Sequence, residues 1–217
     1  FYADYAAKMK QAIQQEILPI EKPYAEYMGR YILALAFDLA DGEWYKPYCD
    51  KLAELVQARN GKLGTGFLAT PFILQVLDRI GRHDLAKQIL WQTDCPGWLY
   101  EVKMGATSIW ENWGAVQPDG TPNKTSYDHY AFGVVDTYLT ETVCGIQAAA
   151  PGFDKIRIAP CADSGFAEFE RSFISEHGEI RVSRCRDALA VMIPPNTTAE
   201  IIWKGQHHET GSGTYVF

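Results

Sequence analysis

The spacing of apolar residues changes once along this chain of 217 residues. Up to about Cys144 they recur every three to four positions, as on one face of a helix, and after Pro151-Gly152 they alternate with polar residues, as on one face of a strand. A chain whose helices all precede its strands does not form the alternating units of a parallel βαβ sheet. We therefore expect two domains: a helical one over residues 1–150, and an antiparallel β-sandwich over residues 151–217.

About seven helices are expected in the first domain. The best-defined one begins with Thr70 as N-cap and Pro71 at its first helical position, and it stops at Gly81. A short helix is expected around Glu111, and a last one from about Ser126 onward. The apolar stripes that predict the other four are Met9-Ile13-Ile17, Tyr27 to Leu39, Tyr48 to Val56 and Leu85 to Leu90.

Short strands are expected in the second domain about every ten residues, a spacing that is typical of a sandwich. Hairpin turns are expected at Ser175 to Gly178 and at Arg186-Asp187, and Pro194-Pro195-Asn196 is expected to end a strand. The alternating apolar positions that predict the strands are Ile156-Ile158, Phe169-Phe173, Ile180-Val182, Leu189-Val191-Ile193 and Ala199-Ile201-Trp203.

The composition is that of a soluble globular protein, with 47% hydrophobic and 22% charged residues. A net charge of −7 is the opposite of the basic excess that nucleic-acid-binding surfaces carry. No stretch reaches the ~18 to 20 apolar residues that a membrane-spanning helix needs. We therefore expect neither nucleic acid nor a membrane as a partner.

The five cysteines are odd in number, widely spaced and free of any Cys-x-x-Cys pair, which favours thiols over a disulfide framework or a zinc site. Thiols fit the cytoplasm better than an oxidising compartment, but the compartment stays open because the chain starts at Phe1 and cannot be searched for a signal peptide. His207-His208 is expected in an exposed loop rather than a metal site, because no third ligand is suggested nearby.

The segment from Gly105 to Trp113 places one carboxylate, Glu111, between the indole rings of Trp110 and Trp113. A carboxylate between two aromatic rings suits the binding and hydrolysis of a sugar. The apolar C–H face of a pyranose packs on an aromatic ring, and hydrolysis at its anomeric carbon needs a carboxylate that takes a proton from water. A structural interpretation also fits these nine residues, with both tryptophans in the core and Glu111 facing solvent.

Four further motifs surround this segment in a fixed order. They are Leu63-Gly64-Thr65-Gly66-Phe67-Leu68-Ala69-Thr70-Pro71, Gly81-Arg82-His83-Asp84-Leu85-Ala86, Cys95-Pro96-Gly97-Trp98-Leu99-Tyr100 and Ser126-Tyr127-Asp128-His129-Tyr130-Ala131-Phe132-Gly133. From about Tyr24 to Pro195, this ordered set resembles bacterial α-L-rhamnosidases of glycoside hydrolase family 78. The family's central run reads Gly-Ala-Thr-Thr-Ile-Trp-Glu-x-Trp, from which this chain differs at Ser108 alone.

The resemblance implies a fold and a mechanism. The helical domain would be the closing half of an (α/α)6 barrel of twelve helices, followed by the family's C-terminal β-sandwich. Inverting hydrolysis requires a general acid and a general base. Glu111 matches the base, whereas the acid belongs to barrel segments that precede the part resembled here. Asp41-Gly42-Glu43 looks similar to the acidic motif but sits in the wrong place, so we interpret it as a solvated helix terminus.

The resemblance also implies substrate-binding residues. His129 matches a histidine that binds sugar hydroxyls, a role that suits imidazole because its two nitrogens can donate and accept at once. Trp98, Trp110 and Trp113 are expected on the pocket wall, although each also fits a core position, and Gly97 replaces the family's usual serine beside Trp98. This chemistry needs no cofactor and no metal.

The activity implied for the full-length protein is inverting hydrolysis of terminal α-L-rhamnosides. Two alternatives stay open: a noncatalytic carbohydrate-binding or assembly fragment, and an (α/α)6 glycosidase for a different sugar. Without the opening half of the barrel, we expect the 217-residue chain to be inactive. We also expect it to cover its exposed helical faces by self-association or by pairing with the missing N-terminal portion.

Overall fold

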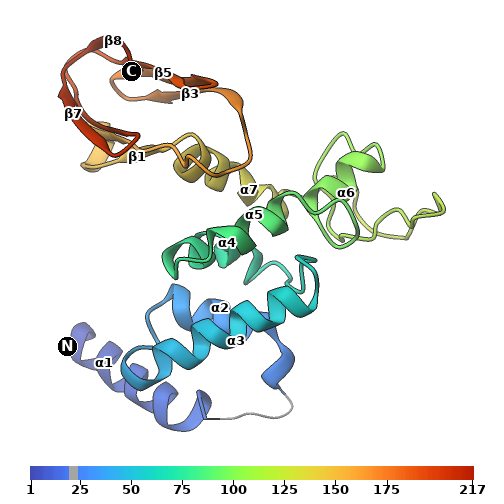
Figure 1. Cartoon of the computed structure of the whole chain (residues 1–217). Coiled ribbons are helices and arrows are strands. Elements are labelled where there is room, and N and C mark those ends of the chain that lie inside the picture. The colour runs from blue at the N-terminus through green and yellow to red at the C-terminus, as the bar shows by residue number, and fades with distance from the viewer. Residues whose placement is uncertain (20–23) are drawn as a thin grey trace. The chain divides into compact units, whose positions relative to one another are not determined.

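The structure is a computed structural model that describes residues 1–19 and 24–217. It divides into two compact units, Phe1–Val134 and Val135–Phe217. The first unit contains helices and the second contains two sheets (Figure 1). This confirms the expected fold class, a helical part followed by a β-sandwich. The domain limits expected from the sequence, 1–150 and 151–217, stay a prediction about the complete protein.

The helical unit is held together by the apolar faces of its longer helices. Met28, Ile32 and Leu35 in α2, Leu52 in α3 and Ile73 in α4 are almost completely buried, and α2 packs against both α3 and α4. Burial of one such side chain contributes about 1.5–3 kcal/mol before the entropy of ordering is subtracted. The elements are α1 (Tyr2–Ala12), η1 (Ile13–Ile17), η2 (Tyr24–Glu26), α2 (Met28–Ala36), η3 (Gly42–Trp44), α3 (Tyr45–Ala58), α4 (Thr70–Arg79), α5 (His83–Leu90), α6 (Trp98–Lys103) and η4 (Tyr130–Val134).

Only the N-terminal end of α4 differs from the boundary expected from the sequence. Thr70 is the first helical residue and Ala69 is the N-cap, because the Thr70 hydroxyl bonds back to the Gly66 carbonyl at 2.9 Å instead of capping the helix. Pro71 therefore occupies the second helical position. At the other end Gly81 has a left-handed φ of 76°, which suits a residue without a side chain and confirms the expected stop.

The helix expected around Glu111 does not exist. Residues 104–129 consist of turns and bends with one isolated bridge between Val116 and Pro122, and Figure 1 shows them as a long loop that follows α6. Backbone hydrogen bonds of residues 109 and 111 go across to residues 126–129 instead of along a helix. The same pairing keeps residues 126–129 out of the final helix, which begins at Tyr130 rather than at about Ser126.

The helix α6 was not predicted by the apolar pattern. It has six residues, which is too short for a periodic stripe to stand out among neighbouring aromatic residues. Trp98 therefore begins a helix instead of ending a loop. Because α6 replaces the helix expected at Glu111, the described residues still contain seven α-helices, α1 to α7.

The second unit contains two four-stranded sheets, with strand orders β1-β2-β6-β7 and β3-β4-β5-β8. All neighbouring strands are antiparallel except β2 and β6, which pair in parallel. The strands β1, β7 and β8 are additional to the five expected ones. The elements are α7 (Val135–Tyr138), η5 (Leu139–Val143), β1 (Ile146–Ala148), η6 (Pro151–Phe153), β2 (Lys155–Ile158), β3 (Glu168–Ser175), β4 (Gly178–Cys185), β5 (Ala188–Ile193), β6 (Thr198–Trp203), β7 (Gln206–Thr210) and β8 (Gly213–Val216).

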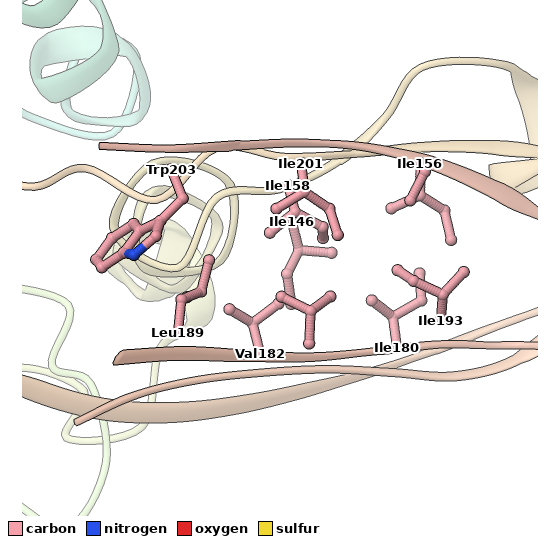
Figure 2. Close-up of a cluster of buried hydrophobic side chains, with 11 residues drawn as sticks. Ile146, Ile156, Ile158, Ile180, Val182, Leu189, Ile193, Ile201 and Trp203 are labelled. Atoms are coloured by element: carbon pink, nitrogen blue, oxygen red, sulfur yellow. The ribbon is translucent and has the colours of Figure 1, made fainter. Parts of the chain in front are cut away.

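The core of this unit lies between the two sheets. Figure 2 shows Ile156, Ile201 and Trp203 of one sheet pointing toward Val182 and Leu189 of the other. Alternate residues of β2, β5 and β6 are buried, so the period of two found in the sequence reports this inner face directly.

Most of the expected connections in the sandwich are confirmed. Two-residue turns at Glu176-His177 and Arg186-Asp187 join β3 to β4 and β4 to β5, and β5 ends just before Pro194. The expectation of a loop at His207-His208 is wrong, because these residues lie in β7 and pair with β6. β7 has no buried residue, so it carries no apolar alternation that the sequence could reveal.

The described part of the chain contains neither a membrane-spanning helix nor a metal-binding cluster. None of its helices is both long and apolar enough to cross a bilayer. No group of three His, Cys, Asp or Glu side chains there could hold a metal ion. Asp41, in the Asp-Gly-Glu sequence interpreted as a solvated terminus, is 56% exposed and forms an ion pair with Lys10.

Candidate active site around Glu111

Glu111 lies where two stretches of the long loop run side by side. The Ile109 carbonyl accepts the His129 N–H at 2.8 Å, and the Glu111 N–H donates to the Ser126 carbonyl at 3.1 Å. These bonds hold residues 109–111 against residues 126–129. Two motifs that are separate in the sequence therefore meet, and they bring Glu111 and His129 into one region of the helical unit.

The Glu111 carboxylate is anchored through one oxygen. Its Oε2 accepts hydrogen bonds from the Ser126 N–H at 3.0 Å and from the Thr125 hydroxyl at 3.1 Å. The Ser126 donor, then the Thr125 donor and the nearby His129 ring, hold the pKa of this carboxyl below its usual range. Within the described chain both hydrogen bonds reach Oε2, and Oε1 accepts none. An ionised carboxylate with one open oxygen can accept a proton.

This carboxylate opens into a pocket of about 200 Å³. The walls come from segments far apart in the sequence, and the Trp113 indole N–H joins two of them by donating to the Thr65 carbonyl at 3.2 Å. Glu111 is the one carboxylate among the described residues that line the pocket. The lining residues are Thr65, Gly66, Phe67, Glu111, Asn112, Trp113 and Phe132.

The three candidate tryptophans occupy different positions. Trp113 lines the pocket and stacks on Phe132, with 3.9 Å between ring centroids and 13° between ring planes. Trp98 stands edge-on behind Trp113 at 5.5 Å, and its indole N–H donates to the Phe132 carbonyl at 2.8 Å. Trp110 is buried in a separate cluster with Tyr100. The structure thus brings Trp113 to the wall, with Trp98 behind it and Trp110 in the packed interior.

His129 is the middle ring of a stack of three. Its imidazole is parallel to the ring of Phe67, at 4.8 Å and 4°, and to the ring of Tyr130, at 5.5 Å and 7°. Phe67, on which His129 stacks, lines the pocket, and His129 lies next to it. Its Nδ1 accepts the Ala131 N–H at 3.3 Å, which assigns the proton of the neutral ring to Nε2. With Nδ1 occupied in this way, Nε2–H is the ring group that remains for a sugar hydroxyl, and it is a donor; the substrate-binding role of His129 stays a prediction.

Four residues of this region were not singled out from the sequence: Phe67, Phe132, Thr125 and Glu101. The two phenylalanines lie within the quoted motifs, so their motif positions were a usable signal. Thr125 and Glu101 give no such signal, because their contacts depend on how the loop folds. Glu101 is 2% exposed, and burial raises the pKa of its carboxyl to about 7.

Comparison with known families covers nearly the whole chain. Residues 1–143 match the family described as bacterial alpha-L-rhamnosidase 6 hairpin glycosidase domain, and residues 145–216 match the bacterial alpha-L-rhamnosidase C-terminal domain. The first match places the chain among the glycosidases. More particularly, the chain belongs to the bacterial α-L-rhamnosidase family.

Individual relatives agree with this assignment. An α-L-rhamnosidase of Streptomyces avermitilis is 31% identical over 99% of this chain, and one of Formosa agariphila is 35% identical over 79% of it. The matched parts are 22% and 19% of those proteins, so this chain spans about a fifth of the length of these curated relatives.

Solved structures of two relatives superpose on the entire chain. The native α-L-rhamnosidase from Aspergillus terreus gives a TM-score of 0.91 at 29% identity, and the S. avermitilis enzyme complexed with L-rhamnose gives 0.91 at 30%. The chain corresponds to 26% and 24% of those two proteins.

Proposed function

We propose that the complete protein containing this chain hydrolyses terminal α-L-rhamnosides with inversion, and that Glu111 is the general base. One observation carries the proposal: in a chain of this family, Glu111 lines an aromatic pocket, and its carboxylate is held at Oε2 while Oε1 accepts no hydrogen bond from the described chain. The L-rhamnose complex of the S. avermitilis relative supports this sugar as the unit recognised.

In the proposed step, Oε1 of Glu111 takes a proton from a water molecule while the water oxygen bonds to the anomeric carbon. The bond from that carbon to the glycosidic oxygen breaks, and a carboxylic acid protonates the departing oxygen. Attack from the face opposite the leaving group inverts the configuration. Inverting carboxyl pairs stand about 6.5–9.5 Å apart. Since the described pocket supplies one carboxylate, the acid would come from a segment outside these 217 residues.

The sugar contacts follow from the groups left open at the pocket. Phe67, which is 42% exposed, offers aromatic surface to the apolar face of the ring beside the nearly buried Trp113, and His129 offers Nε2–H to a hydroxyl. Trp98 acts through the wall that it supports behind Trp113, whereas Trp110 lies in a separate buried cluster. A pocket of about 200 Å³ is smaller than the ~300–1,000 Å³ of complete small-molecule sites, which fits one wall of a larger site.

The helical unit also offers an apolar surface to another part of the protein. α1 has no buried residue, and its Tyr2, Tyr5 and Met9, with Phe1 before it, are between 49% and 90% exposed. Clusters of exposed apolar residues mark interaction surfaces. We propose that the missing N-terminal portion covers this face in the complete protein, with self-association of the isolated chain as the alternative.

Glu111→Gln tests the base. The amide keeps the size of the side chain and an oxygen for the Ser126 and Thr125 donors, but it cannot take the water proton. We expect kcat of the complete protein on an aryl α-L-rhamnoside to fall by about 10²- to 10⁴-fold or more, with KM little changed. The matched control is Glu43→Gln, an exposed glutamate of the same unit, which is expected to leave both constants unchanged.

The other outcomes distinguish the alternatives. Wild-type turnover in Glu111→Gln would remove the base assignment, and a raised KM alone would reassign Glu111 to substrate binding. A complete protein that binds L-rhamnose but cleaves no aryl glycoside would indicate the noncatalytic carbohydrate-binding function. Cleavage of an aryl α-D-glucoside in place of the rhamnoside would indicate a glycosidase for a different sugar.

A further inference from the structure

Glu101 is a buried carboxyl in the middle of α6, close to the loop that carries Glu111. Its side chain is 2% exposed, and its Oε2 accepts the Trp110 N–H at 3.2 Å. Its Oε1 is fully buried and has no hydrogen-bond partner within the described chain. A buried polar atom without a partner costs stability, so the burial of Oε1 is unfavourable, whereas Oε2 satisfies the buried Trp110 N–H. Stability accounts for an acceptor at the Trp110 N–H, but it does not account for the unpaired Oε1.

The hydrogen bonds of the loop suggest a different reason. The backbone groups of residues 109 and 111 bond to residues 126–129, as described above. The N–H of Trp110, between them, bonds instead to Glu101. Successive N–H groups of a non-helical chain point in opposite directions, so a stretch paired on one side needs a separate acceptor on the other. Glu101 is that acceptor, and it acts on the residue directly before Glu111.

We propose that Glu101 is a positioning residue for the reaction: it holds the backbone of Trp110 and thereby sets the place of the Glu111 carboxylate at the pocket. The inference rests on the proposed role of Glu111 as base. A displacement of about 1 Å at a reacting group can cost on the order of 10²-fold in rate. A single buried hydrogen bond next to the base can therefore matter for turnover beyond what it contributes to folding.

The environment of Glu101 favours its neutral form. Burial raises the pKa of its carboxyl to about 7, against the smaller opposing effect of the Trp110 N–H. The Cys95 thiol lies within electrostatic reach of Glu101: burial raises the pKa of this thiol, Lys62 lowers it, and the Glu101 charge raises it. The carbonyl oxygen of a neutral carboxyl still accepts the Trp110 N–H. A glutamine at this position would do the same.

Two substitutions in the complete protein separate positioning from folding. Glu101→Met keeps an unbranched side chain of similar length and removes the acceptor, whereas Glu101→Gln keeps an acceptor oxygen. With an aryl α-L-rhamnoside as substrate and an assay temperature well below Tm, we expect Glu101→Met to lower kcat by about 10- to 100-fold, with KM within about threefold. The Tm should also fall, because the buried Trp110 N–H loses its acceptor. Glu101→Gln should retain kcat within about threefold at pH 6.

Each other result overturns the positioning role. Wild-type kcat in Glu101→Met would show that the hydrogen bond to Trp110 is not needed. A lowered Tm with wild-type kcat in that variant would show a purely structural residue, and equal losses of kcat in the Met and Gln variants would show that the acceptor oxygen is not what matters.

Glu111→Gln keeps this test separate from the proposed function. If that variant retains wild-type turnover, the base assignment fails whatever Glu101 does. If it loses turnover while Glu101→Met keeps it, the positioning role alone fails. Because Glu101 is inferred to act through Glu111, adding Glu101→Met to Glu111→Gln should change the residual rate by less than about threefold.

Discussion

The sandwich core and the loop around Glu111 are held in place by different forces. The sandwich buries a continuous cluster of isoleucine, valine and leucine side chains between two sheets, and such burial has no preferred direction. The loop from residue 104 to 129 depends on hydrogen bonds between particular atoms, such as the Ser126 N–H and Oε2 of Glu111. A substitution that changes volume or backbone space should therefore matter most in the sandwich. A substitution that removes one donor, one acceptor or one proton should matter most in the loop.

The largest expected effect on stability concerns backbone space in the sandwich unit. Gly145 has a φ of 75°, and a Cβ there would lie 2.3 Å from both the Ala159 carbonyl carbon and the Pro160 nitrogen. Backbone atoms cannot rotate away as the end of a side chain can. We expect Gly145→Ala to lower the free energy of unfolding by about 3 kcal/mol or more, measured by urea denaturation of the chain.

Gly205→Ala is the matched control for Gly145→Ala. Gly205 has a nearly identical φ of 76°, but a Cβ there would meet nothing within 4 Å. Only the cost of the left-handed conformation remains, about 1–2 kcal/mol. Equal losses of stability at the two glycines would show that backbone strain, and not close packing, dominates in the sandwich.

The same difference explains what the sequence could predict of the fold. Burial on one face leaves a period of two in the sequence, so the strands at Ile156-Ile158 and Ala199-Ile201-Trp203 could be placed from the residues alone. β7 could not be placed, because its side chains are polar and it is defined by its pairing with β6. The pattern of a sequence records burial and does not record hydrogen-bond partners.

In the candidate site, too, the sequence pattern does not reveal hydrogen-bond partners. Glu111 could be selected from its position between two tryptophans within a family motif, but the helix expected around it was wrong. What shapes this region is a set of bonds between residues about 15 apart in sequence, such as Glu111 and Ser126, and no local propensity encodes them. Glu101 sits among the apolar residues Tyr100 and Val102, and its burial follows from the way α6 packs under the loop.

A second prediction tests the sensitivity of the loop region to pH. Folding raises the pKa of Glu101 from 4.5 to about 7, so the folded state binds more protons than the unfolded state between these values. Stability is therefore highest below about pH 4.5 with respect to this group, and it falls as the pH rises toward and through 7, by about 3 kcal/mol in all. Glu101→Gln removes this pH-dependent contribution to stability, because an amide does not titrate in this range. Relative to wild type, the variant should gain about that much stability between pH 4.5 and pH 8 in urea denaturation.

Glu16→Gln is the control for this pH dependence, since it removes an exposed carboxyl from the same unit. Its difference in stability from wild type is expected to be constant across the same pH range. If the Glu101→Gln difference is also constant, Glu101 titrates as a solvated carboxyl and the loop is less closed than its burial indicates.

The smallest expected effect concerns a single donor in the loop. The Thr125 hydroxyl donates to Oε2 of Glu111 at 3.1 Å and, with the Ser126 N–H, keeps the pKa of Glu111 low. Thr125→Val keeps the shape of the side chain and removes the donor, so the pKa of Glu111 rises and the ionised base is lost at a higher pH. In the complete protein, the acid limb of the kcat/KM profile should move to higher pH, with a loss of about three- to tenfold on that limb and little change at neutral pH.

Thr107→Val, at an exposed threonine of the same loop, is the control for this substitution and should leave the pH profile in place. An unmoved acid limb in Thr125→Val would mean that Glu111 does not set it, and the comparison between a core held by burial and a site held by single donors would lose its clearest case.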